Sequence, residues 1–248
     1  MQIPIPTIDQ INRYISQDDD MFIGHTEQHY FSVGEKALKN IIKALENPNT
    51  NSLSVKKILD LPCGYGRVLR WLAACFLDAQ ITACDTNVKA VDFASQQFSA
   101  KAVYSEYEIS KIKLPSNDYD LIWCGSLFTH FDASRWSQLL GLFYDNLAMN
   151  GILVFTTHGR LSEQPMRQQS PIFRLEAAVM RNIMSSYDRQ GFGYANYDDK
   201  YPVYGISISS PTWVFQQIER FSDLRICYML EGGWAYQDVY GVTKQNKA

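Results

Sequence analysis

The chain has 248 residues, of which 46% are hydrophobic and 20% are charged, and its formal net charge is −3. This length is sufficient for one sizeable core, and the composition is that of an ordinary globular protein. Lys and Arg are scattered through a mildly acidic chain, which argues against a nucleic-acid partner, and no apolar run is long enough to span a bilayer.

The number and spacing of the cysteines indicate a reducing cellular compartment. They are odd in number, widely spaced and set in apolar surroundings, and no two of them are separated by two residues (Cys63, Cys75, Cys84, Cys124 and Cys227). This spacing favours neither a zinc site nor a disulfide framework. Because the start also lacks a basic-then-apolar leader, we expect a cytoplasmic protein in a reducing environment.

Residues 1–54 are predicted to form an N-terminal cap. Pro4 and Pro6 discourage a helix at the start, and apolar residues at helical spacing predict a helix over residues 31–45. An acidic run, residues 18–20, lies between the two features. Since this piece precedes the first strand, we expect it to cover the sheet or the mouth of a ligand site.

The next segment has the pattern of a strand, a glycine turn and a helix. Residues 58–61 indicate a short buried strand, Gly64 and Gly66 make a tight turn, and apolar residues follow at helical spacing over residues 68–76. Proteins of the α/β class use this arrangement to expose backbone N–H groups and a helix N-terminus to a ligand. Two glycines alone are a weak signal, because many turns require them.

Alternating strands and helices continue to residue 157. Thr86 or Asn87 can cap the helix after the second strand, Asp132 can cap the helix after the fourth, and Asn150 with Gly151 is expected to end that helix. This alternation predicts a parallel sheet with right-handed crossovers. The strands after the first are predicted over residues 81–85, 102–104, 119–125 and 152–157.

The pattern changes after His158. Residues 159–210 are predicted to hold a polar loop, a helix over residues 172–187 and a segment rich in Tyr and Gly. After a helix over residues 211–221, two strands linked at Gly232 and Gly233 predict an antiparallel hairpin. We expect one domain of four parts: a cap (1–54), a cofactor-binding core (55–158), a substrate-side insert (159–210) and a C-terminal helix and hairpin (211–248).

Asp85 ends the second predicted strand, beside the glycine turn. A carboxylate there can accept hydrogen bonds from both hydroxyls of a ribose, or it can simply cap the next helix. The neighbouring glycine turn favours the ribose. A dinucleotide is disfavoured, because its site needs a small residue three places after the second glycine, where this chain has Leu69. The terminal hairpin also argues against a dehydrogenase.

The run DLPCGYG, from Asp60 to Gly66, resembles the first motif of the class I, Rossmann-like S-adenosylmethionine-dependent methyltransferases, with Pro62 where that family usually has glycine. The resemblance covers roughly residues 55–158 and the C-terminal hairpin. It implies an α/β three-layer sandwich with a seven-stranded, mostly parallel sheet in the order 3-2-1-4-5-7-6, strand 7 being antiparallel. It also implies S-adenosylmethionine as the cofactor.

The resemblance further implies which residues hold this cofactor. The glycine-turn loop would hold its methionine end, Asp85 its ribose, and Ser105 with Glu106 its adenine, while the loop after the fourth strand would line the sulfonium. The implied set is Asp60, Pro62, Cys63, Gly64, Gly66, Asp85, Thr86, Ser105, Glu106, Cys124, Gly125 and Ser126.

Histidines and tyrosines are the candidates on the substrate side. His130 and His158 follow strands at the carboxyl edge of the sheet, where ligands bind, so His130 is the candidate catalytic base; the alternative for each is a hydrogen bond to nearby backbone. His25 and His29 lie one helical turn apart, but no carboxylate or cysteine completes a metal set. The candidate substrate contacts are His25, His29, Tyr30, His158 and Tyr194.

The tyrosines of residues 191–205 can stack on a sugar or a flat ring, but a hairpin that packs its own apolar face on the fold is the interpretation slightly favoured. The favoured function is methyl transfer to a small-molecule or sugar-like acceptor, at oxygen. The alternatives are a cofactor-binding partner protein without turnover, a methyltransferase for RNA or protein, and a dehydrogenase. We expect no membrane partner.

Overall fold

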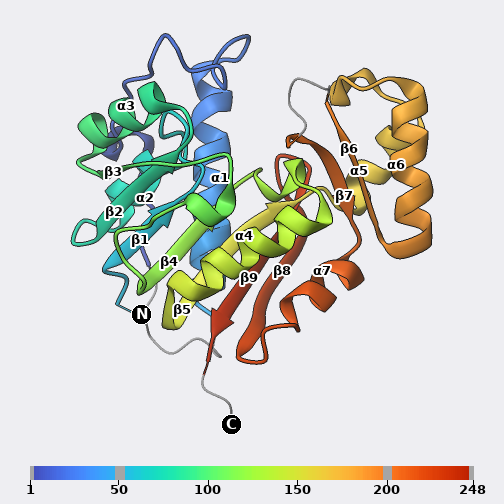
Figure 1. The fold of residues 1–248 in the computed structure, drawn as a ribbon. Helices are drawn as coiled ribbons and strands as arrows, with labels where there is room; N and C mark the ends of the chain where they lie inside the picture. The colour runs from blue at the N-terminus through green and yellow to red at the C-terminus, as the bar shows by residue number, and fades with distance from the viewer. Residues whose placement is uncertain (1–2, 48–53, 198–202, 246–248) are drawn as a thin grey trace.

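The computed structural model describes residues 3–47, 54–197 and 203–245. Seven strands form one central sheet in the order β3-β2-β1-β4-β5-β9-β8 (Figure 1). β1 to β5 run parallel, β9 is antiparallel to β5, and β8 is antiparallel to β9, which confirms the expected topology. The strands are β1 (Lys57–Asp60), β2 (Gln80–Asp85), β3 (Lys101–Tyr104), β4 (Tyr119–Cys124), β5 (Leu147–Thr157), β8 (Leu224–Trp234) and β9 (Gln237–Lys244).

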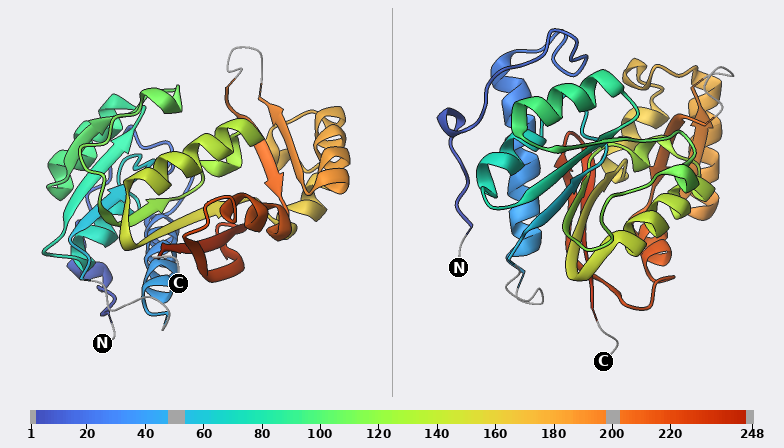
Figure 2. Two further views of the ribbon diagram at one scale, coloured as in Figure 1. Left: turned by 60° about the horizontal axis from the view of Figure 1, so that its bottom comes forward. Right: turned by 60° about the vertical axis from the view of Figure 1, so that its left-hand side comes forward.

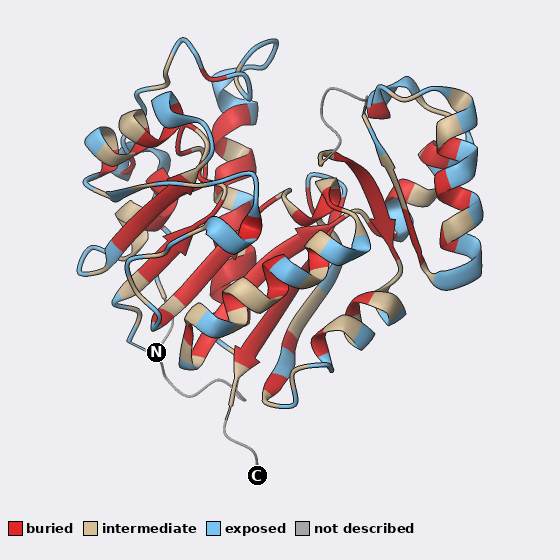
Figure 3. Ribbon diagram, in the orientation of Figure 1, coloured by how far each residue is buried: buried red, intermediate tan, exposed pale blue. Residues whose placement is uncertain are grey.

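Helices cover both faces of this sheet and so make three layers (Figure 2). Successive strand residues point to opposite faces, so Ile58 joins one apolar cluster and Leu59 the other. The central strands are consequently buried along most of their length (Figure 3). Helices α1 (Glu27–Leu45), α2 (Leu69–Cys75) and α3 (Val88–Phe98) pack on the first face, and α4 (Ala133–Asn146) and α7 (Pro211–Ile218) on the second.

None of the helices within residues 3–47, 54–197 and 203–245 is long and apolar enough to cross a membrane. Three short 3₁₀ turns complete the main body: η1 (Ile8–Gln10), η2 (Ile109–Lys111) and η3 (Phe128–His130).

The N-terminal segment covers one side of the sheet, as expected. Thr26 caps α1 by accepting a hydrogen bond from the His29 N–H at 3.2 Å, so this helix begins one turn earlier than predicted. The guanidinium of Arg70 donates to the carbonyls of Asn12 and Tyr14, at 2.9 and 3.1 Å, and so attaches the first segment to α2.

The prediction that Asn150 and Gly151 end the helix before the fifth strand was wrong. α4 ends at Asn146, and Leu147 already pairs with Tyr119 of β4. The left-handed backbone of Asn150 (φ 65°) lies inside β5, where the register with β4 shifts. Asn and Gly tolerate this conformation at a strand irregularity as well as at a helix end, so sequence alone does not distinguish the two.

The insert has a small core of its own, beside the main sheet (Figures 1 and 2). The helix predicted from residue 172 begins only at Ala177, since Arg174 takes a left-handed conformation (φ 52°) after a short 3₁₀ turn. α5, which contains Pro165, was missed within the predicted polar loop. The elements are α5 (Arg160–Arg167), η4 (Pro171–Phe173), α6 (Ala177–Gln190), β6 (Phe192–Asn196) and β7 (Gly205–Ser209), the last two forming an antiparallel pair.

The C-terminal hairpin is present, but its predicted link was wrong. Gly232 and Gly233 belong to β8, and the two-residue turn is Ala235–Tyr236. Both turn residues have positive φ, 48° and 63°, a conformation that favours Asn-Gly in such hairpins. The prediction placed the turn at the two glycines. The actual turn residues, Ala and Tyr, are ones that rarely adopt positive φ.

We expect the double substitution Ala235→Asn with Tyr236→Gly to stabilise the protein, because it relieves left-handed strain in an exposed turn. The gain should be about 1 kcal/mol, or roughly 2–4 °C in the thermal midpoint. Tyr107→Gly is the control, because Tyr107 is also exposed but has no positive φ. This control should be neutral or destabilising. An unchanged midpoint in the double variant would show that the turn carries no strain.

Candidate active site

The glycine turn is fixed between β1 and β2 by backbone hydrogen bonds. The Cys63 N–H donates to the Cys84 carbonyl, and the Gly66 N–H donates to the Cys63 carbonyl, both at 3.0 Å. Gly64 and Gly66 have positive φ, 48° and 78°. A Cβ at Gly66 would lie 2.4 Å from the Phe98 ring, whereas one at Gly64 would meet no heavy atom of the described chain within 4 Å. Gly64 therefore faces open space in which a ligand can approach the backbone.

Asp85 joins this turn to the start of α3. Its Oδ2 accepts from the Gly64 N–H, and its Oδ1 accepts from the Asn87 N–H, both at 2.9 Å. Asn87, rather than Thr86, is the cap of α3, accepting from the Ala90 N–H at 3.3 Å. Each carboxylate oxygen has two lone pairs, so Asp85 can still accept hydrogen bonds from a ligand.

Asp60, at the end of β1, is almost completely buried with 1% of its surface exposed. Neither carboxylate oxygen has a hydrogen-bond partner in the described residues. Burial first, and the negative charge of Asp85 second, raise the pKa of Asp60 well above its ordinary value. A buried acid without a partner is costly for folding, and its presence here indicates a ligand that supplies the missing donor.

Arg67 directly follows the second glycine of the turn, whereas Asp60 precedes the turn. Its guanidinium lies 6.0 Å from the centre of the Tyr30 ring and 5.8 Å from that of Trp234. Within the described ranges it forms no hydrogen bond or ion pair, and burial lowers its pKa. Sequence reasoning missed Arg67, although its position after the second glycine was visible. An unpaired, partly buried guanidinium is suited to a carboxylate.

The other expected cofactor residues lie along the same edge. Pro62 and Cys63 belong to the turn, and the Ser105 N–H donates to the Asp85 carbonyl at 2.8 Å. Thr86 and Glu106 are exposed at this edge. Burial is the main cause that raises the pKa values of the Cys63, Cys84 and Cys124 thiols, so these thiols stay protonated and unreactive.

The loop after β4 turns inward at Ser126, which has a left-handed backbone (φ 61°). The Ser126 N–H donates to Thr156 Oγ1 at 2.8 Å, and its hydroxyl accepts from the Gln237 amide at 2.9 Å. A Cβ at Gly125 would lie 2.8 Å from the Trp123 ring. The loop containing Cys124, Gly125 and Ser126 is thus held by contacts to β5 and β9.

The candidates from the N-terminal cap are of two kinds. His25 and His29 are exposed and stack on each other, with 4.6 Å between ring centres. Tyr30 is fully buried, its hydroxyl donating to Asp19 at 2.6 Å and accepting from Arg70 at 3.3 Å. Because both partners of this hydroxyl lie within the chain, Tyr30 secures the cap and is left out of the proposed substrate contacts.

His130 and His158, the candidates near the insert, contact the backbone of β7. His130 Nδ1 lies 2.8 Å from the Gly205 carbonyl oxygen, and His158 Nδ1 lies 3.0 Å from that of Ser207. Burial lowers the pKa of both imidazoles, that of His158 to about 4. Both histidines therefore bond to backbone, which was the alternative considered for each, and both remain neutral at pH 7.

Two tyrosines near His130 were not among the predicted contacts. The Tyr204 ring stacks on the imidazole at 4.4 Å between centres, and the Tyr197 hydroxyl lies 3.1 Å from Nδ1. The Tyr194 hydroxyl instead donates to Asn196 at 2.5 Å. Tyr194 lies within β6, whereas Tyr197 follows the end of that strand, and no local signal in the sequence separates their roles. Tyr201 lies outside the described residues.

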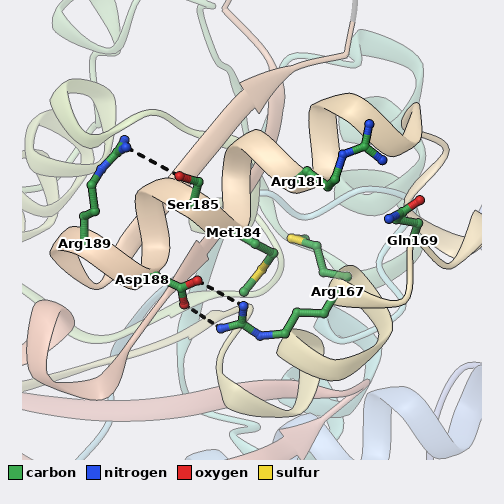
Figure 4. Close-up of a pocket in the computed structure, with 8 residues that line it drawn as sticks. Arg167, Gln169, Arg181, Met184, Ser185, Asp188 and Arg189 are labelled. Atoms are coloured by element: carbon green, nitrogen blue, oxygen red, sulfur yellow. Dashed lines mark hydrogen bonds and ion pairs between the residues drawn. The ribbon is translucent and has the colours of Figure 1, made fainter.

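Two grooves open elsewhere on the surface. One, of about 480 Å³, lies between α5 and α6, where Arg167 is paired with Asp188 and Arg189 donates to Ser185 (Figure 4). Arg167 also donates to Glu163. The other, of about 870 Å³, lies between the first segment and α1. Neither is lined by the glycine turn or Asp85. We therefore place the candidate site by its chemistry, at the carboxyl edge of the sheet.

Comparison with known proteins gives a family for the central part of the chain. Residues 58–151 match a family model described as a methyltransferase domain. The malonyl-[acyl-carrier protein] O-methyltransferase of Bacillus cytotoxicus is 28% identical over 139 residues, which are 56% of this chain and 48% of the relative. The chain thus spans about half the length of the curated relatives it matches.

Two solved structures share the fold at low sequence identity. An S-adenosylmethionine-dependent methyltransferase from Clostridium acetobutylicum has a TM-score of 0.56 and 14% identity, with 88% of this chain and 92% of that chain covered. A protein from Pyrococcus horikoshii has a TM-score of 0.60 and 12% identity, with 94% and 97% covered.

The sheet order, the glycine turn and the family match together define residues 58–151 as a methyltransferase domain of the class I, Rossmann-like type. S-adenosylmethionine is the methyl donor of this class, and the resemblance seen in the sequence is confirmed.

We expect Asp60→Asn to stabilise the free protein and to weaken its affinity for S-adenosylhomocysteine, the product form of the donor. Because the pKa of Asp60 is raised on folding, the folded state disfavours the ionised form, and this penalty is present at every pH above the usual carboxyl range. Removing it should raise the thermal midpoint by roughly 2–4 °C for each 1 kcal/mol gained. The lost charge-assisted bond should lower affinity about 10-fold or more.

Asp238→Asn is the matched control for both measurements. Asp238 is also buried, has one unpaired carboxylate oxygen and has its pKa raised by burial to about 6, but it lies on β9, separated from β1 by β4 and β5. The control variant should gain stability and keep its affinity. If Asp60→Asn keeps full affinity in calorimetry, the carboxylate does not contact the ligand.

Proposed function

We propose that this protein transfers the methyl group of S-adenosylmethionine to an oxygen atom of a small-molecule acceptor. The observation that carries the proposal is the buried, unpaired carboxylate of Asp60 beside the glycine turn. Such a group needs a positively charged or hydrogen-bond-donating ligand, and the methionine end of the donor carries an ammonium group.

The residues around the turn fit the donor in charge and in hydrogen-bonding capacity. Asp60 would pair with the ammonium, Arg67 with the carboxylate, and Asp85 would accept from the ribose hydroxyls through its remaining lone pairs. The open space at Gly64 admits the ligand close to the backbone. Ser105 and Glu106 would border the adenine, and Cys124, Gly125 and Ser126 the sulfonium.

When bound, the donor supplies a methyl group on a positively charged sulfur, ready for in-line displacement. The chain contributes alignment and exclusion of water, since the walls of the site are buried strand ends and a tightly bonded turn. Holding two reactants in line can lower the barrier by roughly 7–11 kcal/mol. A general base is needed only when the acceptor is a poor nucleophile, such as a hydroxyl.

A carrier-bound acyl group is the second candidate acceptor. Its support is that several curated relatives are named malonyl-[acyl-carrier protein] O-methyltransferases. We assign contact with such a carrier to the groove between α5 and α6, which Arg181 and Arg189 line (Figure 4). Arg181→Ala would weaken turnover of a carrier-linked acceptor and leave a free acceptor unaffected. Equal turnover of both would dismiss this groove as a docking surface.

The remaining proposals concern the substrate class, the domain organisation and the cellular compartment. The net charge of −3 does not favour an RNA or protein substrate. We further propose that the chain forms a single domain and works in the reducing environment of the cytoplasm. A cofactor-binding protein without turnover is the rival from a different class. It would bind S-adenosylhomocysteine but form none of it in an acceptor screen with the methyl donor.

We expect S-adenosylhomocysteine, and not NADH, to raise the thermal midpoint. A ligand at about 100 times its dissociation constant adds roughly 2.7 kcal/mol, which corresponds to several degrees for a chain of this size. Asp85→Ala should weaken binding by about 10- to 100-fold, since it removes a charged hydrogen-bond acceptor and releases Gly64.

Asp78→Ala serves as the control for this series, because the Asp78 side chain is 88% exposed and its one ion pair is to Lys56 at 3.7 Å. Its affinity should equal that of the unmodified protein. A midpoint raised by NADH alone would overturn the proposal, and wild-type affinity in Asp85→Ala would remove this residue from the ribose site.

A further inference from the structure

Two histidines contact backbone carbonyls at the outer edge of β7 in the same way. β7 pairs with β6 on one side, and Gly205, Ser207 and Ser209 turn their backbone groups to the other. The carbonyl of Gly205 contacts His130 Nδ1 at 2.8 Å, and that of Ser207 contacts His158 Nδ1 at 3.0 Å. Residues two apart in a strand direct their carbonyls to the same side, so β7 presents the two imidazoles side by side.

These contacts fix the position of the proton on each ring. A carbonyl oxygen can only accept a hydrogen bond, so Nδ1 must carry the hydrogen in both histidines. Nε2 is then the bare nitrogen with a lone pair. Neither Nε2 has a hydrogen-bond partner among residues 3–47, 54–197 and 203–245. The insert thereby sets both rings in the tautomer that can receive a proton.

His158 is anchored at a second point, because its own carbonyl accepts from the Ser209 N–H at 2.9 Å. The two rings are close enough for the charge of His130 to lower the pKa of His158 further, after burial as the larger cause. Aromatic rings surround the pair: Tyr204 is stacked on His130, and Phe173 lies edge-on to His158 with 6.0 Å between centres. The site thus has two hydrogen-bond acceptors in an aromatic setting.

The pair also lies next to the cofactor half of the site. Tyr204, stacked on His130, is within electrostatic range of Asp85 and Asp20. His130 and His158 themselves follow β4 and β5, the two strands that continue the sheet from β1. An acceptor held by the two histidines would therefore stand at the edge where the methyl donor is proposed to bind.

We propose that His130 and His158 form an acceptor-binding pair for the hydroxyl groups of a substrate, and that this substrate is an alcohol or a phenol with a second hydroxyl rather than a carboxylate. The inference rests on the proposed function and deepens it. A hydroxyl donates its hydrogen to a bare Nε2, whereas a carboxylate brings only lone pairs and would face two like acceptors. The aromatic surroundings suit a ring or sugar that carries the hydroxyl.

The two histidines take different parts in the reaction. A hydroxyl has one hydrogen, so the reacting hydroxyl donates it to His130 Nε2, while His158, with a pKa of about 4, stays neutral and orients the substrate by accepting from a second hydroxyl. As the acceptor oxygen bonds to the methyl carbon, the O–H bond breaks and its proton moves to His130 Nε2, and the electrons of the C–S bond remain on sulfur. The proton then leaves to solvent.

Nitrogen NMR on the ¹⁵N-histidine-labelled full chain, saturated with S-adenosylhomocysteine, tests the pair directly. We expect His130 and His158, assigned through His130→Gln and His158→Gln, to carry hydrogen on Nδ1 and to remain neutral at pH 7. Failure to bind S-adenosylhomocysteine would defeat the proposed function itself. Binding with either ring protonated at pH 7, or with hydrogen on Nε2, would overturn only the pair.

Turnover supplies the second readout. A panel of alcohols and phenols, each with its carboxylate counterpart, is offered with the methyl donor, and S-adenosylhomocysteine formation is measured. We expect methylation of hydroxyl members, a drop in kcat of about 10²-fold or more in His130→Gln, and a raised KM in His158→Gln. Asp78→Ala, the exposed control used above, should leave both values unchanged. Methylation confined to carboxylates would overturn the assigned substrate class.

Discussion

Two unlike charges flank one short turn, and neither has a partner in the described part of the chain. The carboxylate of Asp60 is buried at the end of β1, and the guanidinium of Arg67 lies between two aromatic rings seven residues later. In a folded protein, opposite charges so near in sequence usually pair with each other or with water. Their separation here is the constraint on which the site depends, because it suits a ligand that carries both charges itself.

The rest of the cofactor half keeps these charges apart and in place. Hydrogen bonds from the turn to β2, and from Gly64 to Asp85, hold the loop between neighbouring strands. The cap contributes from the other side, since Arg70 and Asp19 share the hydroxyl of Tyr30. The insert is built separately, around its own apolar cluster. Under the proposed function, such an insert would allow the acceptor to change without altering how the donor is held.

The sequence predicted those features that depend on local pattern. Alternating strands and helices predicted a parallel sheet, and the run from Asp60 to Gly66 predicted the turn, whereas the strand order came from the family resemblance that this run carries. The errors lie where one residue type serves two conformations: Asn150 fits a helix end as well as a strand irregularity, and Gly232 fits a turn as well as a strand. Contacts between distant segments, such as Tyr204 on His130, leave no local pattern at all.

The orientation of the histidines depends on backbone carbonyls of β7, not on its side chains. The side chains of this strand have other tasks: Ile206 and Ile208 fill the core of the insert, and a Cβ at Gly205 would lie 2.0 Å from the Ala195 carbonyl oxygen. A deletion of one residue would act on the histidines themselves, because every carbonyl beyond it would turn to the other edge. The length of this strand is therefore what keeps both imidazoles in place, and an inspection of its side chains alone would overlook that role.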